Sequence, residues 1–327
     1  MTTSMTRRAF CAALAAVPFG LSAIAHAQSD YPNRPIKLVV GYPPGGPVDI
    51  TAREMGRVLS ESLGQNVVVD NRPGASGLIG NEIVAKSAPD GYSLVAATSV
   101  MAIQETLFPK LPYDTAKDFT FVGSLVSAPL LLVVPNSLPV KSVQDLIALA
   151  KQKPGELSYA SPSSGSANHL AAELLKTMAG IDLVHIPYKG GAPAETDLIA
   201  GRVAFTFATI ASALPKVRQG QMRAIAVSSS HRSPIAPEIP TVAESGLPGF
   251  DAITWYGVLG PAGMPTDVTM RLNSAINSAL QAPALKEKLI SQGLEPMPGT
   301  PQQFVDFYKA ESAKWGKVAK TSGAKLD

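Results

Sequence analysis

The chain has 327 residues, one cysteine and a formal net charge of +3 at pH 7, which falls to +1 when Arg7 and Arg8 are left out. So balanced a charge gives no electrostatic case for a nucleic-acid partner or an anionic membrane surface. The lone Cys11 excludes an internal disulfide framework, so ordinary hydrophobic cores must hold the fold. Charged residues are sparse, whereas glycine and proline are abundant, which favours an α/β protein with many short loops.

The first residues match an export signal. A basic stretch with a twin-arginine pattern, Thr6–Phe10, precedes the apolar run Cys11–Ile24 and an A-x-A cleavage signal at Ala25–Ala27. We expect delivery to the periplasm with removal of residues 1–27, by the general secretory or the twin-arginine route. No later stretch approaches the roughly 20 apolar residues of a transmembrane helix. Removing 27 of 327 residues leaves 300, too many for one core, so two domains are expected.

The stretch that follows predicts a strand, a glycine loop and a helix. Leu38–Val40 is an apolar run that the loop Tyr42–Gly46 ends abruptly. Pro47 suits the first helical position, with Gly46 as N-cap, Asp49 near the free amides and Arg53 as its i,i+4 partner. Such a helix start attracts anions, and paired glycines let a ligand approach the backbone closely.

Further strands are expected at Val67–Val69 and Tyr92–Ala97, with helices ending near Gly64 and spanning Leu78–Ser87. This alternation predicts parallel strands joined by crossover helices. Ligands on such sheets lie at the carboxyl ends of the strands. The loop Tyr42–Gly46 and the pair Thr98-Ser99 should therefore share one edge of the sheet.

The middle of the chain repeats this arrangement. A helix opens at Ser142 with an S-x-x-D capping box, and the loop Ser161–Ser166 leads into a helix over Ala167–Met178 with Ser166 as N-cap. Two helix N-termini are thus available, one in each expected domain. The strands predicted in this region and beyond are Leu130–Val134, Leu157–Ala160, one beginning at Val184, Val203–Phe207, Ala224–Val227 and Ile253–Leu259.

A glycine loop, Tyr188–Gly191, leads into a further helix at Ala192–Ala200, and Pro234–Pro248 is expected to be a connection. The C-terminal part predicts two helices, Thr266–Gln281 and one opened by Thr300–Gln303. The second carries an apolar stripe, interrupted by Glu311, which should pack against the first domain with the carboxylate paired or at an open edge. The stripe consists of Phe304, Phe307, Tyr308, Trp315 and Val318.

Several blocks together resemble the periplasmic solute receptors of tripartite tricarboxylate transporters, the Bordetella uptake (Bug) family. They are GYPPGGPVDITAR, NRPGASGLIGNEIVAKSAPDGYSLV, PGELSYASPSSGSANHLAAELL, HIPYKGGAPAETDLIAGRV, RAIAV, PTVAESG and WYGVLGPAGMP, and they cover nearly the whole chain after the export signal. The resemblance implies an α/β, two-domain periplasmic-binding-protein fold of type II-like design with a ligand cleft between the domains. Residues 28–126 with 250–327 would form the first domain and 127–249 the second.

The resemblance also implies a function. Members bind small carboxylates, often through ordered waters, and domain closure presents the loaded receptor to integral membrane transporter subunits. A monomer without cofactor, metal or catalytic residues is expected. The positions that match the family's binding loops are Tyr42, Pro44, Gly45, Gly46, Asp49, Thr98, Ser99, Ser161, Ser163, Ser164, Ser166, His169, Tyr188, Ala208 and Thr209.

One position departs from the family pattern. Many relatives carry an Asp-Asn pair where this chain has Ala208-Thr209. Losing that carboxylate removes a partner for a ligand ammonium, which argues against an amino acid and for a non-amino di- or aromatic carboxylate. Tyr42, Ala208 and Trp255 would then offer apolar surface.

Structural roles compete with ligand binding at several positions. N-terminal capping and the Arg53 pair account for Asp49 without a ligand, and His169 stands inside its helix, where a packing histidine is common. Trp255 suits an apolar core. The loop Ser161–Ser166 can be a plain turn, and Lys189 stays undecided.

Two other functions remain open. A hydrolase would need a nucleophile motif, but Gly74–Gly77 lacks the final glycine of G-x-S-x-G, and the histidines His169, His185 and His231 are too scattered for a zinc site. No phosphate-binding P-loop or dinucleotide fingerprint is present. A binding protein that signals to a sensor partner would have the same sequence features as a transport receptor.

Overall fold

The computed structural model describes residues 31–107 and 110–322. The predicted export signal lies outside the described residues and stays a prediction. Within the described part, no helix is both long and apolar enough to cross a membrane. The described residues from Pro32 to Ser322 form one compact unit.

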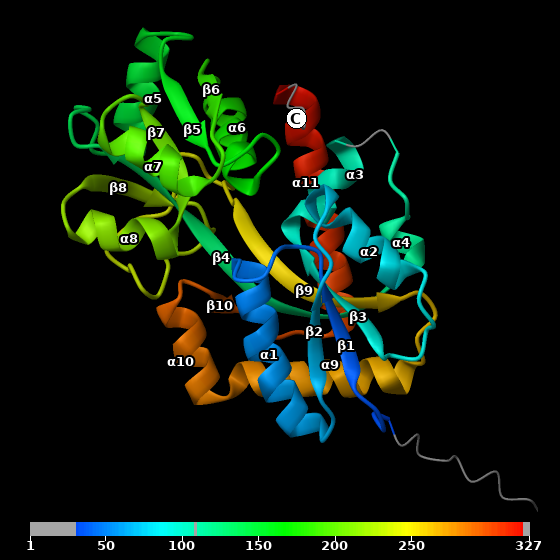
Figure 1. The fold of residues 1–327 in the computed structure, drawn as a ribbon. Coiled ribbons are helices and arrows are strands. Elements are labelled where there is room, and N and C mark those ends of the chain that lie inside the picture. Colours follow the sequence, from blue (N-terminus) through cyan, green and yellow to red (C-terminus); the bar gives the residue numbers. More distant parts are fainter. Residues whose placement is uncertain (1–30, 108–109, 323–327) are drawn as a thin grey trace, which may run out of the picture. The chain divides into compact units, whose positions relative to one another are not determined.

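A mixed sheet of ten strands runs through the described part of the chain (Figure 1). The strands are β1 (Ile36–Val40), β2 (Val67–Asn71), β3 (Ser93–Thr98), β4 (Phe119–Pro135), β5 (Ser158–Ser161), β6 (Val184–Pro187), β7 (Phe205–Thr209), β8 (Met222–Val227), β9 (Ile253–Pro261) and β10 (Glu295–Pro296). Their order is β2-β1-β3-β9-β4-β7-β5-β6, and β8 and β10 also pair with β4. Parallel pairs lie toward both ends of this order, whereas β4 and β9 run antiparallel to their neighbours.

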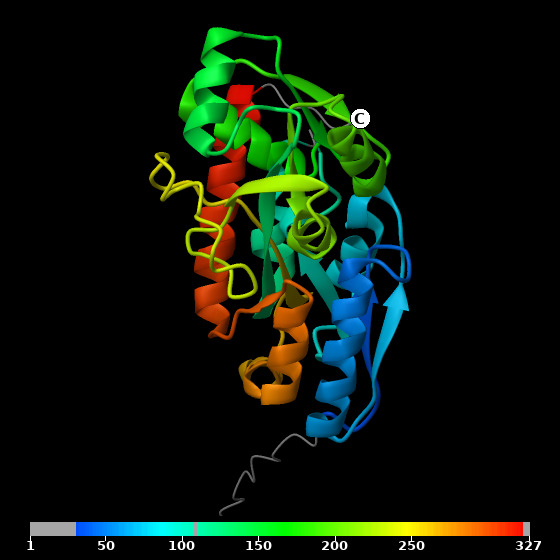
Figure 2. The same cartoon turned by 90° about the vertical axis from the view of Figure 1, so that its left-hand side faces the viewer.

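The helices connect and cover these strands (Figures 1 and 2). They are α1 (Pro47–Leu63), α2 (Leu78–Ala85), α3 (Ser99–Leu107), α4 (Thr115–Asp118), α5 (Val143–Gln152), α6 (Ala167–Ala179), α7 (Gly191–Ile199), α8 (Ile210–Arg218), α9 (Thr266–Gln281), α10 (Pro283–Ser291) and α11 (Pro301–Ser322), with a 3-10 turn, η1, at Ala75–Gly77.

The predicted helix starts are confirmed. Gly46 is the N-cap of α1 with Pro47 in its first turn, and Gly64 closes the helix at φ 70°. Ser142 and Ser166 cap α5 and α6 by accepting backbone N–H bonds. At the start of α11, Thr300 and Gln303 exchange side-chain to backbone bonds of 3.2 and 2.8 Å, which is the expected capping box.

The predicted strand Leu130–Val134 was too short. It is the end of β4, which starts at Phe119 and pairs with β9 over Phe119–Pro129 before it pairs with β7 and β8. The first part of β4 contains small residues such as Gly123 and Ser124, and bulges interrupt its register with β9. These features weaken the apolar pattern on which the prediction relied.

Four helices were missed. α4 has only four residues, which is too short to give a periodic apolar pattern. α3 begins at Ser99, directly after β3, so no Gly or Pro marks the boundary. α8 contains Pro215, which normally signals a helix end. α10 follows α9 after Ala282 alone, and a one-residue break is too short to appear as a loop in the sequence.

Helix α11 packs against more of the molecule than predicted. Its Phe304 and Tyr308 belong to a hydrophobic cluster with Trp255 and the strands of the first part of the sheet. Its Trp315 and Val318 belong to a second cluster with α6 and strands β4, β5 and β7. Packing of the stripe against residues of the expected first domain is confirmed at Phe304 and Tyr308, and the stripe is long enough to reach the second cluster as well.

The interruption in that stripe is paired. Glu311 is buried, and its carboxylate accepts a bond of 2.9 Å from Trp315 Nε1 and forms an ion pair with Lys314. The predicted core position of Trp255 is also confirmed, since its side chain is 1% exposed. The predicted domain boundaries stay a prediction; within the compact unit, the chain passes from one part of the sheet to the other inside β4 and returns before β9.

Candidate functional site

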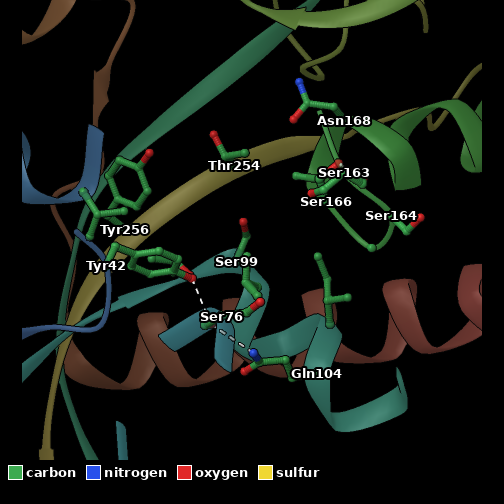
Figure 3. A pocket seen from close by; sticks show the side chains of 16 residues that line it. Tyr42, Ser76, Ser99, Gln104, Ser163, Ser164, Ser166, Asn168, Thr254 and Tyr256 are labelled. Atoms are coloured by element: carbon green, nitrogen blue, oxygen red, sulfur yellow. Dashed lines mark hydrogen bonds between the residues drawn. The ribbon is translucent and has the colours of Figure 1, made fainter. Parts of the chain in front are cut away.

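A pocket of about 260 Å³ opens where α3, α6 and β9 approach one another (Figure 3). Its sixteen lining residues are Tyr42, Val48, Ser76, Thr98, Ser99, Val100, Ile103, Gln104, Ser163, Ser164, Gly165, Ser166, Ala167, Asn168, Thr254 and Tyr256. None of them carries a charged side chain. The pocket is therefore lined by hydroxyls, amides and apolar groups, and any ligand charge must be met by hydrogen bonds and helix ends.

One wall is the start of α3. β3 ends at Thr98 and α3 begins at Ser99. Both residues are buried and line the pocket, and Thr98 pairs with Tyr256 of β9 in the sheet register. Tyr42, which follows β1, places its hydroxyl 3.1 Å from Thr98 Oγ1. The prediction that the Tyr42 loop and Thr98-Ser99 share an edge of the sheet is confirmed at these residues.

The opposite wall is the start of α6. Ser166 accepts the backbone N–H of His169 at 3.2 Å, while the first-turn amides of Ala167 and Asn168 donate to no acceptor among the described residues. Figure 3 shows the serine-rich loop and Asn168 on one side of the pocket, with Ser99 and Gln104 of α3 on the other. Free amides and the positive end of a helix make this wall suited to an anion.

A strained turn completes the wall beside α3. Ala75 and Ser76 have φ values of 46° and 53°, a left-handed conformation that is unfavourable for residues other than glycine. The Ser76 carbonyl accepts bonds from the Tyr42 hydroxyl at 3.2 Å and Gln104 Nε2 at 3.0 Å, which hold the turn. A Cβ on Gly41 would lie 2.6 Å from Gly77 Cα, so only glycine lets the turn sit this close to β1.

The two tyrosines of the pocket remain protonated near neutral pH. Burial raises the pKa of Tyr42, and its hydrogen bond with Thr98 only partly offsets this effect. Burial likewise raises the pKa of the Tyr256 hydroxyl. Both phenols therefore stay hydrogen-bond donors and add no negative charge to the pocket.

A second pocket, of about 250 Å³, adjoins the first and shares Asn168 with it. It contains the predicted residues Ala208 and Thr209 at the end of β7. It also contains two charged side chains, Glu195 of α7 and Lys216 of α8, which form an ion pair. A carboxylate therefore lines the same pocket as Ala208, but it belongs to Glu195 of α7 and not to the end of strand β7.

The structure brings together some of the residues predicted to bind ligand. Those that line the first pocket are Tyr42, Thr98, Ser99, Ser163, Ser164 and Ser166, and Ala208 and Thr209 line the second. Pro44, Gly45, Gly46, Asp49, Ser161, His169 and Tyr188 line neither pocket. Direct ligand contact by these residues stays a prediction.

Asp49 holds the first loop in place. It is 2% exposed and accepts bonds from Arg53 Nε at 3.0 Å, Gly45 N at 2.9 Å and Asn71 Nδ2 at 2.9 Å. Burial alone would raise the pKa of this carboxyl, but the three hydrogen bonds and the Arg53 charge lower it to about 2. The Asp49 carboxylate is therefore paired and hydrogen-bonded within the protein, as the capping interpretation predicts.

Ser161 and His169 lie behind the second loop. Ser161 Oγ lies 2.7 Å from His185 Nε2 and donates to the Ser163 carbonyl, while His169 Nδ1 accepts the Gly165 N–H at 3.0 Å. The two imidazole rings stack with centroids 3.9 Å apart. These contacts set the shape of the loop that presents Ser163 to Ser166.

Tyr188 is likewise bonded within the protein. Its hydroxyl donates to Asp197 Oδ2 at 2.8 Å, and its ring packs on the hydrophobic cluster beneath β7. Thr254 and Tyr256, which sequence analysis missed, alternate on β9, and a period-two argument would have found them. Ser76, Gln104 and Asn168 carry no comparable signal in the sequence.

Hydroxyls and helix starts around an uncharged pocket at the ends of sheet strands define a small-molecule-binding protein of the α/β class. A family model described as "Tripartite tricarboxylate transporter family receptor" matches residues 51–324, and the chain belongs to this family of solute receptors. No group of three or more His, Cys, Asp or Glu side chains that could hold a metal occurs in the described part of the chain.

Individual relatives support this assignment. Protein BugT of Bordetella pertussis is 42% identical over 298 residues, which cover 90% of this chain and 91% of BugT. The protein of the tcbD-tcbE intergenic region of Pseudomonas sp. strain P51 is 40% identical, covering 95% of this chain and 93% of the relative.

Solved structures agree with the fold. The structure of R. palustris Rpa4515 with adipate has a TM-score of 0.77 at 41% identity, covering 91% of this chain and all of the other. MatC of Rhodopseudomonas palustris with bound malate has a TM-score of 0.72 at 30% identity, covering 88% of this chain and 99% of MatC.

Proposed function

We propose that this protein is a periplasmic receptor that captures a small organic carboxylate and delivers it to the membrane subunits of a tripartite tricarboxylate-type transporter. The observation that carries the proposal is the uncharged pocket between the starts of α3 and α6. A carboxylate in this pocket meets partial positive charge from both helix ends, so it needs no arginine.

The direct contacts proposed in this pocket are hydroxyls and amides. Ser99 and Thr98 offer hydroxyls beside α3, and Ser163, Ser164 and Ser166 offer them beside α6. The amides of Ala167 and Asn168 add two N–H donors. Water molecules complete the remaining bonds at little cost, as is common in polar binding sites.

The ligands in the solved structures of two relatives favour this ligand class. One relative was solved with adipate and another with malate, and both ligands are small dicarboxylates. We propose a non-amino dicarboxylate for this chain, with an aromatic carboxylate as the alternative. Residues 28–126 with 250–327 and residues 127–249 are proposed as two domains that close on it.

A signalling role for the same receptor stays a second candidate, because binding and closure serve both functions. An enzyme is not favoured. Ser161, whose hydroxyl is bonded to the His185 side chain, is 0% exposed and lines neither pocket. A substrate cannot reach a nucleophile in that position.

A thermal-shift panel tests the proposal. The panel contains adipate, malate, benzoate, aspartate and an ester substrate. A ligand at about 100 times its dissociation constant adds roughly 2.7 kcal/mol of stability, which raises the midpoint measurably. We expect a shift with at least one of adipate, malate and benzoate, no shift with aspartate, and no ester turnover. Turnover without any carboxylate shift would replace the receptor with the hydrolase.

A further inference from the structure

The second pocket contains a buried ion pair that the proposed carboxylate site does not use. Glu195 of α7 is 3% exposed, and Lys216 of α8 pairs with its Oε2. Ser212 Oγ donates to Glu195 Oε1 at 2.6 Å and lies 2.8 Å from Thr209 Oγ1. Among the described residues that line either pocket, Lys216 is the one cation and Glu195 the one anion.

The pair decides which ligand charge this pocket accepts. Glu195 is 3% exposed, each of its oxygens already accepts a bond, and Lys216 balances its charge, so a ligand ammonium meets no net negative charge there. Lys216 is different, because its side chain is 34% exposed and its ammonium has three donors. It can keep its bond to Glu195 and still offer N–H groups and positive charge to a ligand.

The position of the pair relative to the first pocket gives it a role in selection. The two pockets meet at Asn168, so an elongated ligand with one carboxylate at the helix starts extends toward Lys216. The argument against amino-acid ligands therefore does not rest on the absence of a carboxylate at Ala208. It rests on Lys216, which forms an ion pair with the nearby Glu195 carboxylate.

We propose that Lys216 determines ligand charge, by withholding Glu195 from ligand ammonium groups and presenting its own charge to the second carboxylate of a dicarboxylate. This inference rests on the proposed receptor function and specifies its substrate class. The receptor then selects linear dicarboxylates against amino acids of the same length.

Calorimetric titration with adipate and 6-aminohexanoate tests this selection, because these ligands differ only in one terminal group. The wild-type protein is expected to bind adipate ~10-fold or more tightly than 6-aminohexanoate, the effect of one favourable charge contact. Lys216→Met exposes the Glu195 carboxylate, so adipate should bind ~10-fold more weakly and 6-aminohexanoate ~10-fold more tightly. Glu195→Gln frees Lys216, so adipate affinity should rise and 6-aminohexanoate should gain nothing.

Opposite changes in the two variants separate selection from simple damage. A purely structural pair would weaken both ligands in both variants, and that result would overturn the inference. Lys216→Arg should keep the wild-type preference. Arg202→Met removes an ion pair with Asp197 outside both pockets and should leave the ligand ratio unchanged. Thermal melts identify a variant that fails to fold. If Lys216→Met fails, the sign of the change in adipate affinity in Glu195→Gln decides the inference alone.

The inference and the proposed function fail differently. If the wild type binds adipate but neither variant alters the preference, the role of Lys216 is wrong and the receptor stands. If the wild type binds neither adipate nor any other carboxylate of the thermal-shift panel, the receptor proposal is wrong, and the inference falls with it.

Discussion

Tyr42 connects three parts of the site through one hydroxyl. It donates to the carbonyl of the strained residue Ser76 and shares a hydrogen bond with Thr98, which leads into α3. Its ring lies under Gly77, whose added Cβ would contact the phenol at 3.4 Å. The Tyr42 side chain thus holds a loop, a turn and a helix start together. Burial raises the pKa of its hydroxyl, so the proton that bonds to the Ser76 carbonyl stays in place.

Tyr42→Phe should therefore weaken carboxylate binding by about tenfold, because loss of the hydroxyl releases the Ser76 turn and breaks the bond to Thr98 at the start of α3. Calorimetry with adipate measures the change. Tyr113→Phe removes a hydroxyl that accepts a bond from Asn81 outside both pockets, and its affinity should match the wild type. Equal losses in both variants would assign the effect to general destabilisation.

Asp49 makes stability depend on pH. Its folded pKa of about 2 lies below the ordinary value of 3.8, so the folded state favours the ionised carboxylate. The stability that ionised Asp49 adds is complete above about pH 4 and is lost as the pH falls through 2. Because its partner Arg53 is exposed and solvent screens the pair, this contribution to the free energy of unfolding amounts to about 1–2 kcal/mol.

Asp49→Asn should lower the free energy of unfolding at pH 7 by that amount, and the difference from wild type should shrink toward pH 2. Urea unfolding at several pH values measures it. Glu61→Gln removes an exposed ion pair from the same helix and should change stability little at any pH. A deficit in Asp49→Asn that persists unchanged at pH 2 would contradict the role assigned to ionisation.

At the scale of elements, the proposed binding surface consists of helix starts. The sequence predicts the starts of α1 and α6 because each has a marked cap, Gly46-Pro47 or Ser166, after a glycine- or serine-rich loop. It fails to predict the start of α3, since Thr98 and Ser99 carry the chain from strand to helix without a break. The pocket uses α6 and α3, while α1 contributes only Val48.

The same contrast applies to the rest of the site. Residues next to turn signals, such as Ser163 and Ser166, could be predicted because loop chemistry is local. Ser76 and Gln104 could not, because their roles depend on a contact between η1 and α3 that only the tertiary fold creates. Glu195 and Lys216 lie on two helices and meet only through packing.

Ser166→Ala should cost about 1 kcal/mol of stability and also weaken carboxylate binding, because the cap orders the α6 amides that face the pocket. Ser142→Ala is a matched control, since Ser142 caps α5 in the same way but lines neither pocket. It should lose similar stability with no loss of affinity. Chemical denaturation and calorimetry on both variants provide the comparison, and equal affinity losses would disprove a special role for α6.

At the scale of the whole molecule, shared elements hold the sheet together. β4 and β9 pair along most of their length, and β4 continues to β7 and β8. α11 adds a second connection, with Phe304 in one hydrophobic cluster and Trp315 in the other. Figure 2 shows it as one uninterrupted helix. The binding site proposed between α3 and α6 lies on a framework that both clusters support.

Trp315→Ala should lower the free energy of unfolding by about 3–5 kcal/mol, because it opens a cavity in a fully buried position and leaves Glu311 without its indole donor. Lys317→Ala changes an exposed position of the same helix and should have almost no effect. Urea unfolding monitored by circular dichroism compares the two. A loss below about 1 kcal/mol in Trp315→Ala would show that α11 contributes little to the second cluster.

Calorimetric titration with adipate and with adipamide, its uncharged diamide, tests the central claim most directly. The two molecules have the same length and nearly the same shape, so they differ mainly in the charge that the helix starts are proposed to bind. We expect one adipate bound per chain and no measurable binding of adipamide. Equal binding of both, or binding of neither adipate nor malate, would contradict a carboxylate receptor built on the starts of α3 and α6.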